Sequence, residues 1–327
     1  MGRRRKITSI VVSLLVLGIS TMCRAGAAEQ LTEADTYEKT GRFAQTEPIY
    51  QQIAAANPGT DVGLEAQRKL AIMYIDWDKG EKLETAFVDL LTNFSQNETV
   101  PNAAYTIPQR YEEAYEKQKA DIYYRRIITK WPVYNVSVLS RMQLAMHRID
   151  DGNDGAVDAI FADLVNVLPN DNCSAYATYH IAAYYYELGK YQRAVQYFQY
   201  VLDRWPNYDN AVHCQTFIAT ANLYLGNTGG TKAAIDKMCR DFADGQGIGS
   251  GIWNIVKYYR ELEKYQDGRQ FFQSVLDSNS HGNKRFWALT GVAMCEVGCG
   301  NDSSVQSVSI ICVQSLPQTI RCLSHFP

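Results

Sequence analysis

The feature that most constrains this chain is a spacing of 37 residues between prolines that follow similar apolar segments. Pro132, Pro169 and Pro206 stand at this spacing, and Pro58 and Pro317 fall on the same frame. Five of the nine prolines in the 327-residue chain therefore share a single register. Self-similarity at a fixed period of this size is typical of a repeat architecture, in which each unit is one supersecondary element.

Apolar residues recur inside each unit at fixed distances from the frame proline. In the unit that ends at Pro206, Phe198, Val201 and Leu202 stand eight, five and four residues before it. Spacings of three and four place such residues on one face of a helix. A second apolar position, occupied here by Ile181, recurs at a fixed place in the first half of each unit. The two stripes predict two amphipathic helices in each unit.

Glycine separates the two stripes in four of the units. Gly41, Gly152, Gly189 and Gly226 occupy the same position of the frame, between the two apolar stripes. Glycine adopts the left-handed backbone conformation that ends many helices, and proline cannot continue a helix interior. Each unit is therefore predicted to contain helix A, a turn, helix B and a stop. One such hairpin cannot bury both apolar faces, so the hairpins must stack.

Residues 179–206 resemble a tetratricopeptide repeat (TPR). The family's small and aromatic positions on helix A are matched by Ala182 and Tyr185, and its turn by Gly189 and Tyr191. The helix B positions are matched by Ala194, Phe198 and Pro206. The resemblance implies an all-α, right-handed superhelical solenoid of seven to eight helix-turn-helix repeats across residues 28–301.

The period of 37 residues is longer than the family's usual period of about 34. In this respect the chain resembles the TPR proteins of bacterial cell envelopes, of the outer-membrane-assembly lipoprotein and Tol–Pal coordinator types. That resemblance implies a protein–protein interaction scaffold or assembly adaptor of the envelope. Pro108 falls inside the predicted helix A of the third unit, where it should kink the helix or delay its start.

Residues 1–27 have the pattern of a secretory signal peptide. A positive segment runs from Arg3 to Lys6, an apolar segment from Ile10 to Leu17, and small residues lead to a cleavage position after Ala27. The apolar segment is too short for a membrane anchor, which needs about 20 residues. We therefore expect an exported protein, located in the periplasm or cell envelope, or secreted.

Lipidation of Cys23 is the alternative for this segment, although Ser20-Thr21-Met22 matches the lipoprotein pattern poorly. Only in that case do we expect membrane attachment. The whole chain has a formal net charge of -3, and removal of residues 1–27 changes it to -8. This acidic balance argues against nucleic acid or an anionic lipid surface as the main partner.

The sequence changes character near the C-terminus. Residues 285–298 fit helix A of an eighth unit, whereas residues 302–327 carry few formal charges and lack the helix B pattern. We expect this tail to be disordered or non-native, or else a short cap or docking segment. Because Pro317 falls on the frame, a poor helix B is a further alternative.

No pattern in the chain indicates an enzyme, a metal site or a cofactor site. Residues 245–251 are rich in glycine, but they follow a predicted helix B, whereas a dinucleotide-binding loop follows a strand. We expect a flexible joint between repeats there. No histidine has a partner at zinc-ligand spacing. Cys214 and Cys239 fall on one predicted hairpin, where they form a disulfide or remain buried thiols.

The inner face of a helical solenoid is lined by helix A residues and binds extended or helical segments. Tyrosine, tryptophan and arginine dominate binding hot spots. The predicted partner-binding residues on this face are Tyr176, Tyr179, Tyr186, His213, Tyr224, Trp253, Lys257, Arg260 and Trp287. Their partner would be a protein or peptide segment, and Lys257 and Arg260 would suit an acidic or C-terminal one.

Two alternatives to this prediction remain. The same tyrosines and tryptophans could stack on sugars, which would make the chain a glycan-binding or cell-wall-associated protein. Many of the 22 tyrosines could also simply pack between hairpins, as we expect for Tyr185 and Tyr259.

Overall fold

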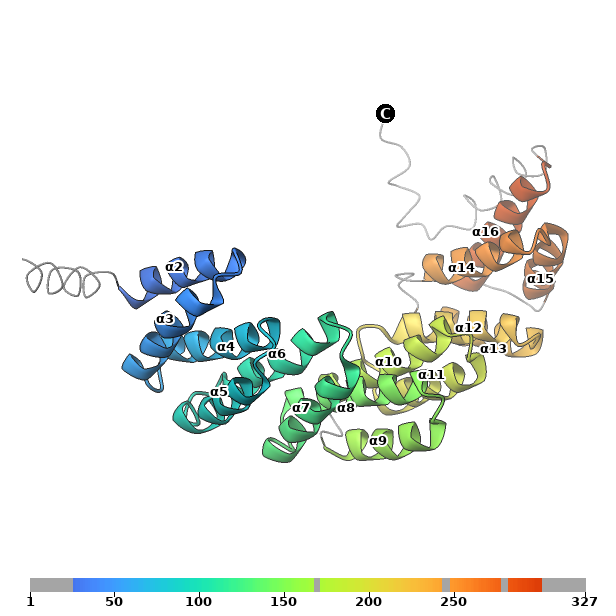
Figure 1. Cartoon of the computed structure of the whole chain (residues 1–327). Helices are drawn as coiled ribbons and strands as arrows, with labels where there is room; N and C mark the ends of the chain where they lie inside the picture. Colours follow the sequence, from blue (N-terminus) through green and yellow to red (C-terminus); the bar gives the residue numbers. More distant parts are fainter. Residues whose placement is uncertain (1–25, 168–170, 243–247, 278–281, 302–327) are drawn as a thin grey trace, which may run out of the picture. The chain divides into compact units, whose positions relative to one another are not determined.

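The structure, a computed structural model, describes residues 26–167, 171–242, 248–277 and 282–301. Within these residues it contains fifteen helices and no strand (Figure 1). The predicted all-α fold class is therefore confirmed. The chain divides into two compact units, residues 1–144 and residues 145–327. Nearly all of the predicted signal peptide, over residues 1–25, and the tail over residues 302–327 lie outside the described residues.

Unit 1 is a series of antiparallel helical hairpins. Its helices are α2 (Ala27–Lys39), α3 (Phe43–Ala56), α4 (Asp61–Asp76), α5 (Gly80–Asn93), α6 (Val100–Glu113), α7 (Lys117–Lys130) and the first part of α8 (Asn135–Asp150). Consecutive helices from α2 to α7 pack against one another, and α4 also packs against α2 and α6. Helix A of one hairpin thus contacts helix A of its neighbours, as a stack of hairpins requires.

Unit 2, taken by itself, is also a series of helical hairpins. It contains the rest of α8 and then α9 (Asp154–Val167), α10 (Asn172–Glu187), α11 (Tyr191–Arg204), α12 (Ala211–Tyr224), α13 (Thr228–Asp241), α14 (Ile248–Glu261), α15 (Tyr265–Asp277) and α16 (Gly282–Gly298). Here α12 packs against α10 and α14, and α14 packs against α16. The described residues thus form seven hairpins and helix A of an eighth, as expected.

The turn after helix A recurs at the 37-residue period in all eight sequence repeats. The residues at this position, with φ between +53° and +72°, are Gly41, Asp78, Tyr115, Gly152, Gly189, Gly226, Glu263 and Gly300. At a typical turn, the Gly189 N–H donates to the Tyr186 carbonyl at 3.0 Å and the Lys190 N–H to the Tyr185 carbonyl at 2.9 Å. This pair of hydrogen bonds defines the Schellman motif, which satisfies the last carbonyls of helix A. The turn predicted from four glycines is confirmed at those four and extends to four further positions.

The two predicted apolar stripes form the core. On helix A, the frame position that Ile181 occupies is buried in every copy from Leu70 to Ile255. On helix B, the frame position that Val201 occupies is buried in every copy from Ile53 to Val275. Tyr185 is fully buried, so its predicted packing role is confirmed.

Two local expectations need correction. Pro108 does not delay the start of its helix, because α6 runs from Val100 to Glu113 with Pro108 enclosed. The start of α6 coincides instead with Pro101 in its first turn, a position where the missing N–H has no intrahelical partner to lose.

The second correction concerns the glycine-rich segment. Its described part, from Ile248, is the first turn of α14 and not a loop. A Cβ on Gly251 would lie 2.8 Å from Thr216 Oγ1 and 3.0 Å from Met238 Sδ. The absence of a side chain therefore lets α14 approach α12 and α13 closely.

No helix in the described part of the chain has the length and the hydropathy needed to cross a membrane.

Candidate partner-binding surface

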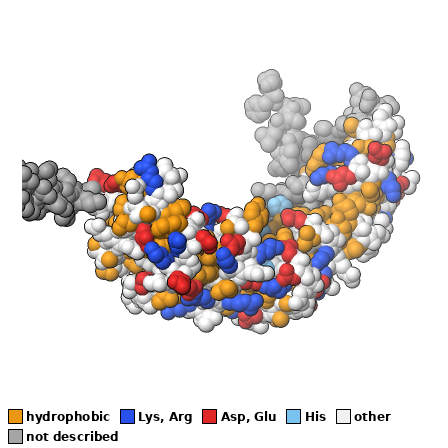
Figure 2. Space-filling model, in the orientation of Figure 1, with side chains coloured by type: hydrophobic (Ala, Val, Ile, Leu, Met, Phe, Trp, Pro, Cys, Tyr) orange, Lys and Arg blue, Asp and Glu red, His pale blue; other side chains and the backbone are white. Residues whose placement is uncertain are grey.

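Three of the A helices of unit 2, α10, α12 and α14, contact one another in series. Three of the predicted partner-binding residues are exposed on them: Tyr176 on α10 at 42%, Tyr224 on α12 at 41% and Trp253 on α14 at 45%. We call these three side chains the aromatic surface. Large aromatic groups left in water are the usual anchors of protein interfaces. In Figure 2, hydrophobic side chains gather where α12 and α14 lie, with charges of both signs around them.

Two other predicted residues, Tyr179 and Tyr186, are half-buried, and only Tyr186 contacts the aromatic surface, at Tyr224. The Tyr179 ring lies 5.7 Å from Phe198 and 6.3 Å from Phe217, measured between centroids, and burial raises the pKa of Tyr179 to about 12. The Tyr186 hydroxyl donates a hydrogen bond to Thr220 Oγ1 at 3.0 Å. Both rings therefore pack between hairpins, the alternative role that the sequence had left open.

The two predicted cations of α14 both have neighbours within unit 2. Lys257 Nζ lies 3.6 Å from Glu261 Oε1, and the Arg260 guanidinium lies over the Trp253 ring at 5.5 Å from its centroid. Burial, followed by Tyr186 and Glu261, raises the pKa of Tyr224 to about 12. The charge of Glu261 thus acts close to the aromatic surface and offsets the nearby cations. Glu261 therefore weakens the electrostatic attraction that Lys257 and Arg260 would exert on an acidic partner.

The remaining two predicted residues, His213 and Trp287, contact residues that do not belong to the aromatic surface. His213, half-buried at the start of α12, has Nδ1 3.3 Å from Asn210 Oδ1. The Trp287 ring packs on Gly249, with Cη2 3.0 Å from the position that a Cβ would occupy. Both side chains have local structural roles, at a helix start and at the α14–α16 contact.

One contributor to this face could not be found from the helix A positions. Tyr191, assigned only to the turn, stacks on Tyr224 with 4.5 Å between ring centroids. Leu188, Leu225 and Leu262 stand one period apart, directly before the turn residues, and are 48%, 47% and 46% exposed. Exposed leucines thus recur at the 37-residue period in three successive repeats.

No group of three or more histidine, cysteine, aspartate or glutamate side chains within the described ranges is placed to hold a metal ion. Cys214 and Cys239 are free thiols, so the alternative without a disulfide is the one observed. Burial raises the pKa of Cys214 to about 12, which keeps this thiol protonated and unreactive at neutral pH.

Comparison with known proteins gives one family match. Residues 176–208, which cover most of α10 and all of α11, match the family model of the tetratricopeptide repeat. The resemblance seen in residues 179–206 is thereby confirmed for this hairpin. No curated protein matches the chain.

Several solved structures are similar. One is the C-terminal part of a TPR repeat-containing protein from Cytophaga hutchinsonii, with 16% identity, 80% of this chain and 98% of that chain covered, and a TM-score of 0.41. A tetratricopeptide repeat protein from Parabacteroides merdae has 13% identity and a TM-score of 0.39, and the match covers 82% of this chain and 98% of that chain. PilF of Pseudomonas aeruginosa has 12% identity and a TM-score of 0.37, and the match covers 67% of this chain and 92% of that chain.

Proposed function

We propose that this chain of TPR-like hairpins is an exported protein–protein interaction scaffold of the cell envelope. It binds a segment of a partner protein on the helix A face of α10, α12 and α14. The TPR-like fold supports a scaffold role in general terms, because stacked hairpins present a long continuous surface for binding. The export step rests on the signal-peptide pattern of residues 1–27.

The observation that carries the proposal is the aromatic surface. Tyr176, Tyr224 and Trp253 are each more than 40% exposed on helices that pack in series. Leaving such side chains in water forgoes the favourable free energy of burying them, roughly 25 cal/mol per Å² of apolar surface. A partner segment that covers them recovers this free energy.

The charges near the aromatic surface favour a partner that is apolar or aromatic over one that is strongly acidic. Lys257 and Glu261 are 3.6 Å apart and neutralise each other. Arg260 lies over the Trp253 ring, where its guanidinium can donate to one carboxylate or carbonyl of the partner. We therefore expect a segment that presents two or three large apolar side chains and one acceptor to Arg260.

The test is affinity capture from envelope extract of the producing cell with two variants of the full chain. The first replaces the aromatic surface (Tyr176→Ala, Tyr224→Ala, Trp253→Ala). The matched control replaces Val133 and Tyr134, which are 62% and 51% exposed in unit 1, with alanine. Circular dichroism must first show equal helicity. We expect one partner protein to be lost with the first variant and kept with the control. A partner kept by both would refute the assigned surface.

The export step has its own test. Cleavage after Ala27 predicts a mature chain that starts at Ala28, and the intact mass of the purified exported protein reports this directly. A fatty-acylated chain that begins at Cys23 would instead establish the lipoprotein alternative.

A further inference from the structure

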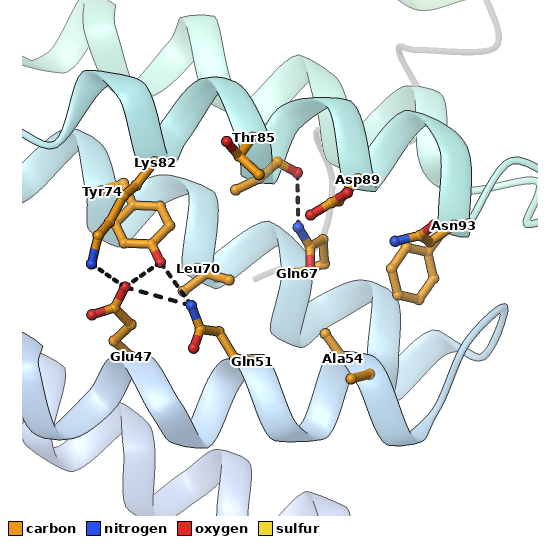
Figure 3. A pocket seen from close by; sticks show the side chains of 13 residues that line it. Glu47, Gln51, Ala54, Gln67, Leu70, Tyr74, Lys82, Thr85, Asp89 and Asn93 are labelled. Carbon is orange, nitrogen blue, oxygen red and sulfur yellow. Dashed lines mark hydrogen bonds and ion pairs between the residues drawn. The ribbon is translucent and has the colours of Figure 1, made fainter.

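Unit 1 contains a cavity of about 400 Å³ between α3, α4 and α5 (Figure 3). Its apolar floor includes Ala54, Leu70 and Phe94, which are all buried. Polar side chains surround this floor: Glu47 and Gln51 from α3, Gln67 from α4, and Lys82, Thr85, Asp89 and Asn93 from α5. A cavity of this size can hold a long side chain.

The repeat explains why the cavity exists. One period after Ala86 stands Tyr123, and three periods after it stands Tyr197. The Tyr123 hydroxyl donates to Glu84 Oε1 at 2.8 Å, and the Tyr197 hydroxyl donates to Asp158 Oδ1 at 2.9 Å. Between the first and second hairpins the residue at this position is Ala86, which is 3% exposed. It leaves the volume of a phenol ring unfilled.

The position of Asp89 is occupied by a cation in the next repeat. One period after Asp89 stands Arg126, whose Nη1 lies 2.8 Å from each carboxylate oxygen of Glu84. Its guanidinium lies over the Phe87 ring, 4.5 Å from the centroid. The acid equivalent to Glu84 one period earlier is Glu47, which pairs with Lys82 and not with a guanidinium. Asp89 therefore stands where the next repeat has Arg126, and an acid replaces a cation at this position.

The acceptors in the cavity are open. Asp89 is half-buried, and no cation in the described residues pairs with its carboxylate. Gln67 is 5% exposed; its Nε2 donates to the Ala86 carbonyl at 2.8 Å, and its own carbonyl oxygen accepts no hydrogen bond from the described residues. Neither acceptor has a donor within the described residues, so a ligand could supply one. Figure 3 shows Gln67 and Asp89 between the ribbons of α3 and α5.

The lining holds two carboxylates, of Glu47 and Asp89, against the single cation of Lys82. Lys82 Nζ bonds to Glu47 Oε1 at 2.5 Å, and Tyr74 donates to the same oxygen at 2.6 Å, so Glu47 is largely satisfied. The charge of Asp89 remains. An apolar floor, a carbonyl oxygen without a donor and an uncompensated carboxylate together fit a ligand with an aliphatic stem and a planar cationic donor group.

We propose that this cavity binds the side chain of an arginine from a protein partner. The aliphatic stem lies over Leu70 and Phe94. The guanidinium donates to Asp89 and to the carbonyl oxygen of Gln67. This site lies in unit 1 and involves none of the residues of the aromatic surface, so it is independent of the function proposed above.

The probe is Nα-acetyl-arginine amide, with the neutral isostere Nα-acetyl-citrulline amide as its control. The full chain carries ¹³C-labelled alanine and leucine methyl groups, so that Ala86 and Leu70 report from inside the cavity. We expect saturable shifts of both methyl signals with the arginine probe, and at least fivefold weaker binding of the citrulline probe. Single charge-assisted contacts of this kind give affinities in the millimolar range.

Three variants locate the site. Asp89→Asn should weaken the arginine probe roughly tenfold, because it removes the charge and keeps the shape. Asp163→Asn, two periods later on α9, is the matched control and should leave binding unchanged. Ala86→Tyr restores the ring found at Tyr123 and should abolish binding. If Ala86→Tyr does not fold, Asp89→Asn still decides the question.

The proposal is overturned by equal affinity for the two probes, by an Asp89→Asn variant that binds as tightly as the parent, or by the absence of any saturable shift at Ala86 and Leu70.

Discussion

The rings of Tyr191 and Tyr224 stack with 4.5 Å between their centroids and 7° between their planes. Tyr191 begins helix B of one hairpin, and Tyr224 ends helix A of the next. The Tyr186 ring meets both of them edge-on, at 5.2 Å from Tyr191 and 6.3 Å from Tyr224. The Tyr258 ring lies 4.9 Å from Tyr224 as well. The exposed Tyr224 is therefore held in one orientation by three neighbouring rings, which lowers the entropy lost when a partner covers it.

The first prediction concerns this stack. Tyr191→Ala leaves Tyr224 in place but removes one of the rings that fix it. We expect the free energy of unfolding to fall by about 1–2 kcal/mol, and partner affinity to fall although Tyr191 itself is only half exposed. Chemical denaturation and the affinity capture described above measure the two effects. Tyr134→Ala, an exposed tyrosine of unit 1, is the control and should change neither.

The second prediction concerns the left-handed turn positions. Tyr115 has φ +60° and is 93% exposed, so its side chain contributes little packing while its backbone is strained. Tyr115→Gly should raise the free energy of unfolding by about 0.5–1 kcal/mol, after allowance for the greater freedom of glycine in the unfolded chain.

The matched control for that change is the reverse substitution at an equivalent turn. Gly189→Ala places a Cβ at φ +71°, where no neighbouring atom obstructs it, so any loss of stability comes from the backbone alone. We expect a loss of about 1 kcal/mol. If both variants melt at the temperature of the parent, the turn positions do not limit stability.

The third prediction tests the close approach of α14. Gly251→Ala should destabilise the chain by about 1–3 kcal/mol, because the new Cβ would lie within 3.0 Å of Thr216 and Met238. Gly229→Ala in α13 meets no atom closer than 3.7 Å and should be neutral or slightly stabilising, since alanine favours a helix over glycine. Thermal unfolding separates the two. Equal melting temperatures for both variants would contradict the described packing of α14.

The fourth prediction concerns pH. Burial acts to raise the pKa of Glu47, but the hydrogen bonds from Lys82 and Tyr74 outweigh it and hold the pKa below its usual 4.5. A carboxyl group whose pKa is lowered by folding stabilises the fold above its unfolded pKa, and this contribution disappears as the pH falls through the folded value.

Glu47→Gln should therefore cost about 1 kcal/mol at pH 7 and progressively less below pH 4.5. Urea denaturation of both proteins from pH 7 to pH 3 tests this convergence. A difference that stays constant across the range would show that the charge of Glu47 is not the stabilising element.

The sequence was sufficient to predict the fold because each 37-residue repeat forms the same local structure, two amphipathic helices joined by a left-handed turn. Frame prolines, the apolar positions around Ile181 and Phe198, and the turn at Gly189 agree with one another in every copy that retains them. Three turns lacked their glycine, and the fold still placed Asp78, Tyr115 and Glu263 in the left-handed region. There, the packing of neighbouring helices overrode the local preference of the residue.

The candidate surface was harder to predict than the fold. Helix register places Tyr179 and Tyr224 on the same kind of face, yet Tyr179 is enclosed by Phe198 and Phe217 whereas Tyr224 is exposed. That difference depends in part on Phe217 of the next hairpin, which the pattern within one hairpin does not reveal. The cavity beside Ala86 was harder still to predict. Its signal is a small residue where two other copies, Tyr123 and Tyr197, have a tyrosine, and Ala234 is a further alanine at the same position.

The central claim is that a partner segment lies on the aromatic surface of unit 2. The most direct test places a photo-crosslinking phenylalanine analogue at Tyr224, or at Tyr134 as the control position, in the full chain expressed in its own cell. We predict one covalent adduct to a single protein from the Tyr224 position and none to that protein from Tyr134. The claim is contradicted if the Tyr224 position yields no protein adduct, or if both positions yield the same one.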